Sequence, residues 1–312
     1  MWLGKLGSLC VIPALLWAWT SGVAGARPGV EETPPPSLTD DRGHHVRLSH
    51  FSRRIISLSP SITELVYAAG AGDKLVGADL YSDYPYAVKS IPRIGDASSL
   101  DLERIVALEP DLVIAWRSGS AAVDIRRLER LGMNVAATEA SRLEDVPRLL
   151  RLIGQWAGTS TQAESAARAY ENELRTIRDS YAGREKVRMV QLIWRHPLMT
   201  VNGNHIISDI ISICGGVNMF ASAPALTPVI GMENLLEVHP RAIVSSISPR
   251  FDGQEIRLDG RIGGSAMEGS DVIFIHPDLI HRQTPRILQA ARKVCEELDK
   301  VRFATRSGID PM

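Results

Sequence analysis

The 312-residue chain has few aromatic residues, few cysteines and almost no net charge. Aromatic residues make up 5% of it, three cysteines occur, and the formal net charge at pH 7 is −1. Because no excess of basic residues attracts polyanions, nucleic acid is not an expected partner. Because aromatic side chains are scarce, each tryptophan or tyrosine near a predicted strand end carries more weight as a candidate binding residue.

The common catalytic and phosphate-binding motifs are also missing. The sequence contains no G-x-x-x-x-G-K-[ST] loop, no H-E-x-x-H helix, no C-x-x-C pair and no G-x-S-x-G turn. The absence of motifs does not exclude an exported enzyme, but nothing in the sequence proposes one, and we predict no catalytic residues, no cofactor and no metal site. The eight histidines are scattered along the chain. Since a zinc site needs three or four converging ligands, surface or capping histidines are the preferred interpretation.

Residues 1–26 have the pattern of a secretory signal peptide. One charged residue, Lys5, precedes an apolar stretch from Leu9 to Trp19, and Ala24-Gly25-Ala26 has the spacing of a cleavage site. The apolar stretch is shorter than the roughly 20 residues that a membrane-spanning helix needs. We expect cleavage after Ala26 and a soluble mature protein outside the cytoplasm.

Cysteine usage fits export. Removal of the signal takes away Cys10 and leaves Cys214 and Cys295, an even pair in an exported chain. One disulfide is therefore favoured over two buried free thiols. In the chain-entropy model, a bridge that closes a loop of about 80 residues stabilises the fold by roughly 4 kcal/mol.

Strand-like and helix-like segments alternate along most of the chain. Short apolar runs such as Leu112–Trp116 predict buried strands. Predicted helices include Thr63–Ala69 after a Ser59-Pro60-Ser61 loop, Ile206–Ile213 closed by Gly215-Gly216, and Pro285–Leu298. This alternation is typical of a mostly parallel sheet with helices on its faces.

The predicted elements divide the rest of the chain into four parts. Residues 27–53 form an N-terminal arm and a hairpin that turns at Asp41-Arg42-Gly43, and residues 54–158 form an N-terminal α/β lobe. Residues 159–182 form one long helix without internal Gly or Pro, and residues 183–312 form a C-terminal α/β lobe. A helix of about 22 residues spans roughly 33 Å, enough to connect two lobes.

An internal repeat supports two related lobes. Ile62–Gly70 aligns without gaps with Ile207–Gly215, and Leu102–Ile114 aligns in the same way with Met232–Val244. The fold class we predict is α/β, with two Rossmann-like lobes, a ligand cleft between them and one long rigid connecting helix. Clefts between domains are favoured ligand sites, and ligands meet the loops at the carboxyl ends of parallel strands.

Three loops that follow predicted strands carry aromatic residues. They begin at Tyr81, at Trp116-Arg117 and at Trp194-Arg195. An aromatic ring beside a polar group suits a large, flat, partly polar ligand. We predict ligand contact for Tyr81 and Trp116, and a core position for Trp156, which lies inside a helical pattern. The alternative is that each loop ring covers the core of its own lobe.

Glu103 and Glu233 begin helices at equivalent positions of the repeat. A carboxylate in the first turn of a helix is stabilised by the helix dipole, which explains each residue alone. A matched pair, one per lobe, also fits two anchor points for a two-fold symmetric partner with basic pockets.

Four segments have a familiar pattern, namely Ile56–Glu64, Tyr81–Pro85, Leu102–Arg117 and Cys214–Gly216. They resemble the periplasmic cobalamin-binding proteins of ABC importers, which belong to a wider group of iron-complex and cobalamin binding proteins, and the resemblance covers roughly residues 53–300. It implies a periplasmic, monomeric, non-enzymatic protein that holds cobalamin (vitamin B12) or another corrinoid in its cleft. Its implied partner is an ABC importer permease dimer with its cytoplasmic ATPase. The corrinoid would be a transported ligand, not a cofactor.

The resemblance also implies roles for individual residues. Glu103 and Glu233 would dock onto arginines of the permease, and Cys214 and Cys295 would form the family's disulfide. We add Arg117 and Trp194, from the loops that follow strands, to the ligand-binding set that the family implies. The complete set is Tyr81, Trp116, Arg117, Trp194, Asp278, Leu279, Ile280, His281 and Arg282.

The sequence departs from the family pattern at the predicted pocket. Two positions that are tryptophan in the best-known pattern are Ala97 and Thr227 here, and the stretch 278–282 has no aromatic residue. We expect Trp194 to compensate in part, and cobalamin, cobinamide and other corrinoids all fit as ligands. The alternative is a ferric siderophore or haem on the same fold. Positive charge for such an anionic chelate would come from Arg117, Arg195 and Arg282.

Overall fold

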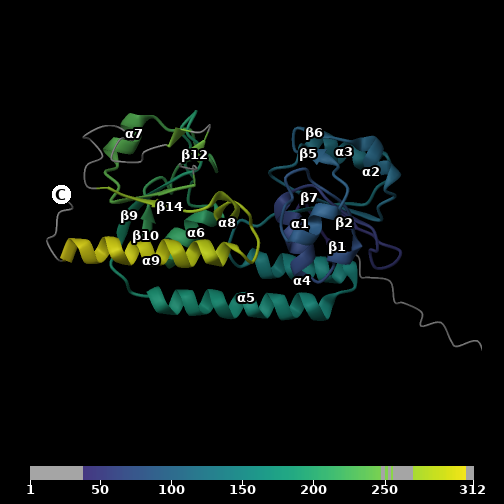
Figure 1. Ribbon diagram of the computed structural model, residues 1–312, viewed down its shortest axis with the longest axis horizontal. Coiled ribbons are helices and arrows are strands. Elements are labelled where there is room, and N and C mark those ends of the chain that lie inside the picture. The colour runs from purple at the N-terminus through teal and green to yellow at the C-terminus, as the bar shows by residue number, and fades with distance from the viewer. Residues whose placement is uncertain (1–37, 247–249, 252–253, 256–269, 307–312) are drawn as a thin grey trace, which may run out of the picture. The chain divides into compact units, whose positions relative to one another are not determined.

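The computed structural model describes residues 38–246, 250–251, 254–255 and 270–306 (Figure 1). The predicted signal peptide and residues 27–37 of the predicted arm lie outside the described residues. The predicted hairpin is confirmed, because β1 (Leu38–Thr39) and β2 (His45–Val46) pair in antiparallel fashion. Over the part of the chain that the structure describes, no helix combines the length and the apolar character needed to cross a membrane.

The N-terminal lobe is built on a four-stranded parallel sheet in the order β4-β3-β7-β8. Its strands are β3 (Ile55–Ser57), β4 (Leu75–Ala78), β7 (Leu112–Trp116) and β8 (Val135–Thr138). Its helices are α1 (Pro60–Ala68), α2 (Leu102–Ala107), α3 (Ala122–Arg130) and α4 (Asp145–Ala157). The smaller elements are the 3-10 turns η1 (Gly72–Lys74) and η2 (Tyr86–Ser90) and the ribbon of β5 (Gly95–Asp96) and β6 (Ser99–Leu100).

The C-terminal lobe repeats this plan in a second four-stranded parallel sheet, in the order β10-β9-β11-β14. Its strands are β9 (Val187–Leu192), β10 (Gly216–Asn218), β11 (Ala242–Ser245) and β14 (Asp271–Phe274). Its helices are α6 (Ile206–Ile213), α7 (Met232–Glu237), α8 (Pro277–Ile280) and α9 (Ile287–Arg306). Strands β12 (Arg250–Phe251) and β13 (Gln254–Glu255) pair in antiparallel fashion.

The two sheets have the same topology. In each, the first strand along the chain is internal, the second lies outside it, and the third and fourth follow on the other side. Helices α1 and α6 follow the first strand of their lobes, and α2 and α7 precede the third. The predicted repeat is therefore a repeat of structure, and the predicted two-lobed α/β fold class is confirmed.

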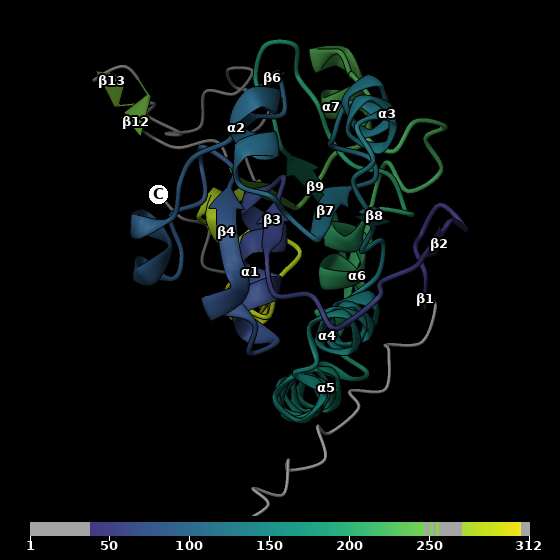
Figure 2. The ribbon, with the colours of Figure 1, turned by 90° about the vertical axis from the view of Figure 1, so that its right-hand side faces the viewer.

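The predicted connecting helix is α5 (Ser160–Tyr181), a single helix of 22 residues. Its buried side chains recur every three or four residues, as one face of a helix requires: Ala163, Ala167, Tyr170, Leu174 and Ile177. Helix α5 packs on α1 and α4 from the first lobe and on α6 and α9 from the second. Figure 1 shows α9 running alongside it, and Figure 2 shows α4 and α5 side by side.

A large apolar core continues through the packed helices. Buried residues of both lobes and of α5 belong to one cluster, which includes Leu112, Ala167 and Val244. Trp156 is fully buried in it, so its predicted core position is confirmed. The predicted disulfide is present between Cys214, which follows α6, and Cys295 of α9.

Several element boundaries differ from the predictions, and the differences at α1, β10 and α9 have identifiable physical reasons. Helix α1 begins at Pro60 instead of Thr63, because the Ser59 side chain accepts a hydrogen bond from the Ile62 N–H and proline is well suited to a first helical turn. Gly216 begins strand β10 instead of closing α6, and a Cβ there would lie 2.3 Å from the Met189 sulfur. Helix α9 continues to Arg306, since neither Gly nor Pro interrupts it.

Candidate ligand-binding site

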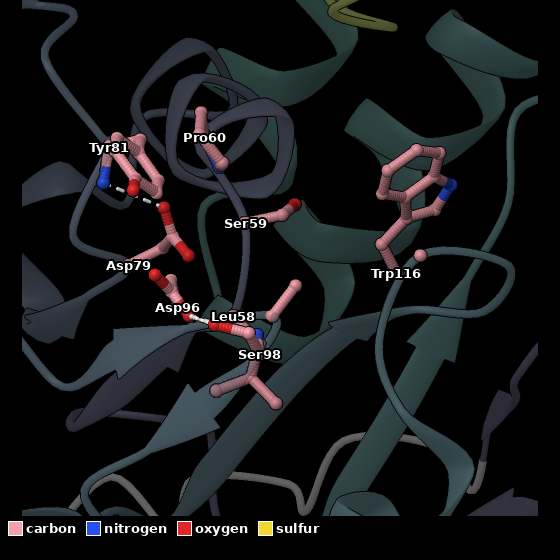
Figure 3. A pocket seen from close by; sticks show the side chains of 10 residues that line it. Leu58, Ser59, Pro60, Asp79, Tyr81, Asp96, Ser98 and Trp116 are labelled. Atoms are coloured by element: carbon pink, nitrogen blue, oxygen red, sulfur yellow. Dashed lines mark hydrogen bonds between the residues drawn. The ribbon is translucent and has the colours of Figure 1, made fainter. Parts of the chain in front are cut away.

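A pocket of about 370 Å³ opens at the carboxyl ends of the strands of the N-terminal lobe (Figure 3). This is the edge where ligands meet parallel sheets, because the loops that leave the strands converge there. In Figure 3 the rings of Tyr81 and Trp116 lie on opposite sides, with Ser59 and Pro60 between them. The lining residues are Leu58, Ser59, Pro60, Asp79, Tyr81, Asp96, Ala97, Ser98, Trp116 and Gly119.

Trp116 is the last residue of β7, and one hydrogen bond holds its indole ring while another holds its backbone. Its Nε1 donates a hydrogen bond to Glu139 Oε1 at 3.0 Å, and its backbone N–H donates to Ser120 Oγ at 3.1 Å. Gly119 leaves the space that the ring occupies. The ring is half-buried and faces the pocket, so the predicted position at the end of a strand is correct.

Tyr81 is exposed over 64% of its surface and forms the opposite wall of the pocket. Its N–H donates a hydrogen bond to Asp79 Oδ1 at 2.8 Å, which shapes the turn after β4. The same loop is contacted from the C-terminal lobe, where the Arg286 guanidinium lies 4.1 Å from the centre of the Tyr84 ring. An exposed ring on a supported loop is suited to covering one face of a ligand.

Two carboxylates, Asp79 and Asp96, give the pocket an acidic wall. Burial raises the pKa of Asp79 to about 6, the Tyr81 N–H opposes this rise, and the Asp96 charge adds to it. Hydrogen bonds from the Ser98 hydroxyl and from the N–H groups of Ser98 and Ser99 lower the pKa of Asp96. None of the lining residues is Lys, Arg or His, although the charges of Arg93 and Arg282, just outside the lining, act on Asp79 and oppose the rise of its pKa. At neutral pH this wall therefore attracts cations and hydrogen-bond donors and disfavours anions.

Arg117 and Trp194 do not line this pocket. Arg117 Nη1 donates to the backbone oxygen of Asp41 at 3.1 Å, and its Nε lies 3.7 Å from Glu139 Oε2. Trp194, in the C-terminal lobe, is 60% exposed, and its Nε1 donates to the backbone oxygen of His196 at 3.0 Å. Ligand contact by these two residues stays a prediction.

The predicted stretch 278–282 packs within the C-terminal lobe and against the N-terminal one. Ile280 is fully buried, and His281 Nε2 lies 2.6 Å from Ser246 Oγ. Burial lowers the pKa of His281 to about 4, so its ring is neutral at pH 7. Arg282 Nη1 contacts Glu64 of α1 at 3.0 Å and Asp83 at 2.6 Å, and its Nη2 contacts Asp278 at 2.9 Å. Leu279 packs against the core.

The two remaining departures from the family pattern fall in different places. Ala97 lines the pocket, where it leaves room that a larger side chain would fill. Thr227 lies in the C-terminal lobe and is not among the residues that line the pocket.

The capping role that the sequence predicts for histidines is found at His205 and His276. The His205 ring accepts a hydrogen bond from the Ile207 N–H, and the His276 ring accepts one from the Asp278 N–H.

Glu103 and Glu233 are exposed in the first turns of α2 and α7. These helices hold equivalent places in the two lobes, as the repeat predicts. Exposed carboxylates at matched positions leave both side chains accessible to another molecule.

The model of a family described as "Periplasmic binding protein" matches residues 55–265. The chain belongs to this family. Over 250 residues, this periplasmic binding protein is 33% identical to the vitamin B12-binding protein of Vibrio parahaemolyticus, covering 80% of this chain and 90% of the relative. It is also 33% identical to the vitamin B12-binding protein of Yersinia pestis over 251 residues, which cover 80% and 88% of the two chains.

Solved structures show the same fold. The periplasmic vitamin B12 binding protein of Vibrio cholerae superposes with a TM-score of 0.73 at 31% identity, covering 80% of this periplasmic binding protein and 98% of that chain. The periplasmic haem-binding protein RhuT of Roseiflexus has a TM-score of 0.67 at 23% identity, covering 80% and 99%. At that identity the second likeness concerns the fold alone.

Sequence reasoning missed the polar side of the pocket of this periplasmic binding protein. Asp79 immediately follows the predicted strand Leu75–Ala78, so its place at a strand end was visible in the sequence. Asp96 ends β5 and Ser98 lies in the turn before β6, and this ribbon is too short to leave a periodic pattern. The sequence predicts a loop and a cap at Ser59-Pro60-Ser61; Ser59 caps α1, Pro60 is the first residue of that helix, and both also line the pocket.

Proposed function

We propose that this protein captures cobalamin or a closely related corrinoid outside the cytoplasm and delivers it to the permease of an ABC importer. The observation that carries the proposal is the placement of Tyr81 and Trp116 on opposite sides of a pocket at the carboxyl ends of parallel strands. A corrin is a large, flat, partly polar ring, and such rings pack well against aromatic side chains. The vitamin B12-binding relatives support the same ligand class.

The charge of the pocket favours a corrinoid over an anionic chelate. A corrin ring carries peripheral carboxamides, whose N–H groups can donate to Asp79 and Asp96. Haem carries carboxylates, which would meet like charge at this wall. Two of the arginines that favoured a siderophore or haem have acidic neighbours, since Arg117 lies near Glu139 and Arg282 contacts Glu64. The corrinoid is therefore the better match.

The pocket covers only part of so large a ligand. At about 370 Å³ it accommodates one edge of a corrinoid, so further contacts must come from elsewhere. Our candidates are Trp194 and the partly exposed residues of the stretch 278–282, without the fully buried Ile280, because they belong to the other lobe and follow β9 and β14. Their contact with the ligand is part of the proposal.

Delivery is proposed to use Glu103 and Glu233 as anchors for permease arginines. Their matched positions on α2 and α7 fit a two-fold symmetric partner.

The proposal includes removal of residues 1–26 on export. Mass spectrometry of the secreted protein should give a chain that begins at Arg27, and an intact N-terminus would contradict this part.

The first experiment is to mix the purified mature protein with cyanocobalamin, remove unbound ligand by desalting and record the visible spectrum. We expect about one corrinoid per chain, and loss of retention in Trp116→Ala and in Tyr81→Ala. Tyr86→Ala is the matched control for Tyr81→Ala, since Tyr86 is 79% exposed nearby but does not line the pocket. A colourless wild-type protein that retains haem or a ferric siderophore instead would overturn the corrinoid proposal.

A further inference from the structure

Besides α5, two carboxylates at matched positions of the repeat link the lobes. Glu64 of α1 and Asp209 of α6 correspond, because Ile62-Thr63-Glu64 aligns with Ile207-Ser208-Asp209. Helices α1 and α6 both follow the first strand of their lobe. Each of the two carboxylates accepts hydrogen bonds from residues of the opposite lobe.

Glu64 is held by three side chains of the C-terminal lobe. Its Oε1 accepts from Nη1 of Arg282 and from Nη1 of Arg286, each at 3.0 Å, and its Oε2 accepts from Thr284 Oγ1 at 3.0 Å. The Glu64 side chain is only 3% exposed. Hydrogen bonds to a buried charge are strong. Removal of one partner is costly, because the other partner's charge is then buried without compensation.

Asp209 is held by the N-terminal lobe in a similar way. Its Oδ1 accepts from Arg142 Nη1 at 2.6 Å, and its Oδ2 accepts from the Leu143 N–H at 3.1 Å. The Asp209 side chain is 13% exposed, whereas that of Arg142 is 51% exposed. This second contact is therefore weaker than the first, since solvent screens its ion pair.

The donors also occupy matched places. Arg142 and Leu143 lie between β8 and α4, and Arg282 and Arg286 lie between β14 and α9. Strands β8 and β14 stand at the same end of their sheets, and α4 packs on α1 as α9 packs on α6. The arrangement is reciprocal, because the first helix of each lobe binds the last strand–helix connection of the other. We call these two contacts the Glu64 clasp and the Asp209 clasp.

The Glu64 clasp is continuous with the loop that carries Tyr81. Arg282 also contacts Asp83 at 2.6 Å, and Arg286 covers the Tyr84 ring. A shift of Arg282 or Arg286 would therefore move the loop 81–86 and the pocket wall that it forms.

We propose that Glu64 and Asp209 are positioning residues that set the separation of the two lobes and hold the Tyr81 loop in its binding position. With a single interlobe contact besides α5, the lobes could still rotate about that contact. Two contacts at separate points oppose this rotation. The ligand readout below rests on the proposed corrinoid function, but the distance readout does not.

The test combines an interlobe distance with a rate of ligand release. Spin labels are placed at Val123→Cys in α3 and Val217→Cys in β10, which are 43% and 42% exposed. Glu64→Gln and Asp209→Asn keep the side-chain shape but remove the charge. We expect one narrow distance distribution in the parent protein and a broader one in the double variant. Cyanocobalamin should dissociate roughly tenfold faster from the double variant, and less than that from Asp209→Asn alone.

The matched control is Glu129→Gln, which removes a 2.8 Å ion pair between α3 of the N-terminal lobe and Arg42 of the N-terminal hairpin, without involving the C-terminal lobe. It should change neither the distance distribution nor the dissociation rate. Charge reversal supplies a rescue: Arg142→Glu should restore the narrow distribution that Asp209→Arg alone broadens. A structural defect unrelated to the clasp would not be repaired in this way.

The proposal is overturned if the folded double variant keeps both the parental distance distribution and the parental dissociation rate. Should Glu64→Gln fail to fold, Asp209→Asn and the reversal pair decide the question, because that clasp is partly exposed. If the parent protein does not bind cyanocobalamin, the function proposed above fails, while the distance distributions still test the clasps.

Discussion

A Cβ atom at Gly119 would lie 1.9 Å from Cε3 of Trp116, so the indole ring occupies space that only glycine leaves open. No L side chain fits at such a distance without displacing the ring. The Trp116–Glu139 hydrogen bond of 3.0 Å and the position of the ring in the pocket both depend on this small residue.

We therefore predict that Gly119→Ala moves the Trp116 ring and weakens cyanocobalamin binding by roughly tenfold, about 1.4 kcal/mol. Isothermal titration measures the affinity, and near-ultraviolet circular dichroism reports the ring. Ser118→Ala in the same exposed loop is the control, and it should bind like the parent. Equal affinities for both variants would show that the ring position does not matter for the ligand.

The raised pKa of Asp79 predicts a pH-dependent gain of stability in Asp79→Asn. The carboxyl has an ordinary pKa of 3.8 and a folded pKa of about 6, so the folded state binds more protons between these values and its stability falls as pH rises. Above pH 6 the buried charge costs up to about 3 kcal/mol, which the amide avoids. Urea unfolding should show the gain at pH 7.5 and little gain at pH 4.

Asp96→Asn should change the folding stability in the opposite direction. The Ser98 hydroxyl and neighbouring N–H groups lower the pKa of Asp96, so its charge contributes stability above its ordinary pKa, and that contribution is lost as pH falls. Its amide variant should be less stable than the parent at neutral pH. If both variants responded alike, the assigned environments of the two carboxyls would be wrong.

The Cys214–Cys295 disulfide closes a segment with a sequence separation of 81 residues. Replacing both cysteines by alanine should lower the free energy of unfolding by up to about 4 kcal/mol, because the unfolded chain gains freedom. Urea titrations with and without a reducing agent measure this difference. Reduction should destabilise the parent and leave the double variant unchanged, and an equal response of both proteins would refute the effect.

The exposed Glu103 and Glu233 allow docking to be separated from ligand binding. We predict that the double variant Glu103→Ala/Glu233→Ala binds cyanocobalamin normally but no longer supports its uptake by cells, because the permease loses both anchors. Glu237→Ala, at the exposed end of α7, is the control and should support uptake. Normal uptake with the double variant would leave only helix stabilisation as the role of these residues.

Local pattern alone predicted the elements that lie in strongly periodic segments. The bounds of Leu112–Trp116 and Ile206–Ile213 are those expected, because apolar runs and helical spacing are properties of neighbouring residues. The repeat predicted the shared topology for the same reason. Local pattern does not predict strand β10, since three residues beginning with glycine have no strand pattern of their own. These residues form a strand only because they pair with β9.

The sequence by itself determined the two-lobed α/β plan, the long connecting helix, the cysteine pair and the aromatic residues at strand ends. Those features depend on short-range periodicity and on the order of elements. Only the tertiary structure decided that Asp79 and Asp96 share one wall of the pocket, and that Arg282 binds Glu64 across 218 positions of chain. Such pairs arise where distant segments meet, and the burial that gives their charges strength exists only after the lobes have folded.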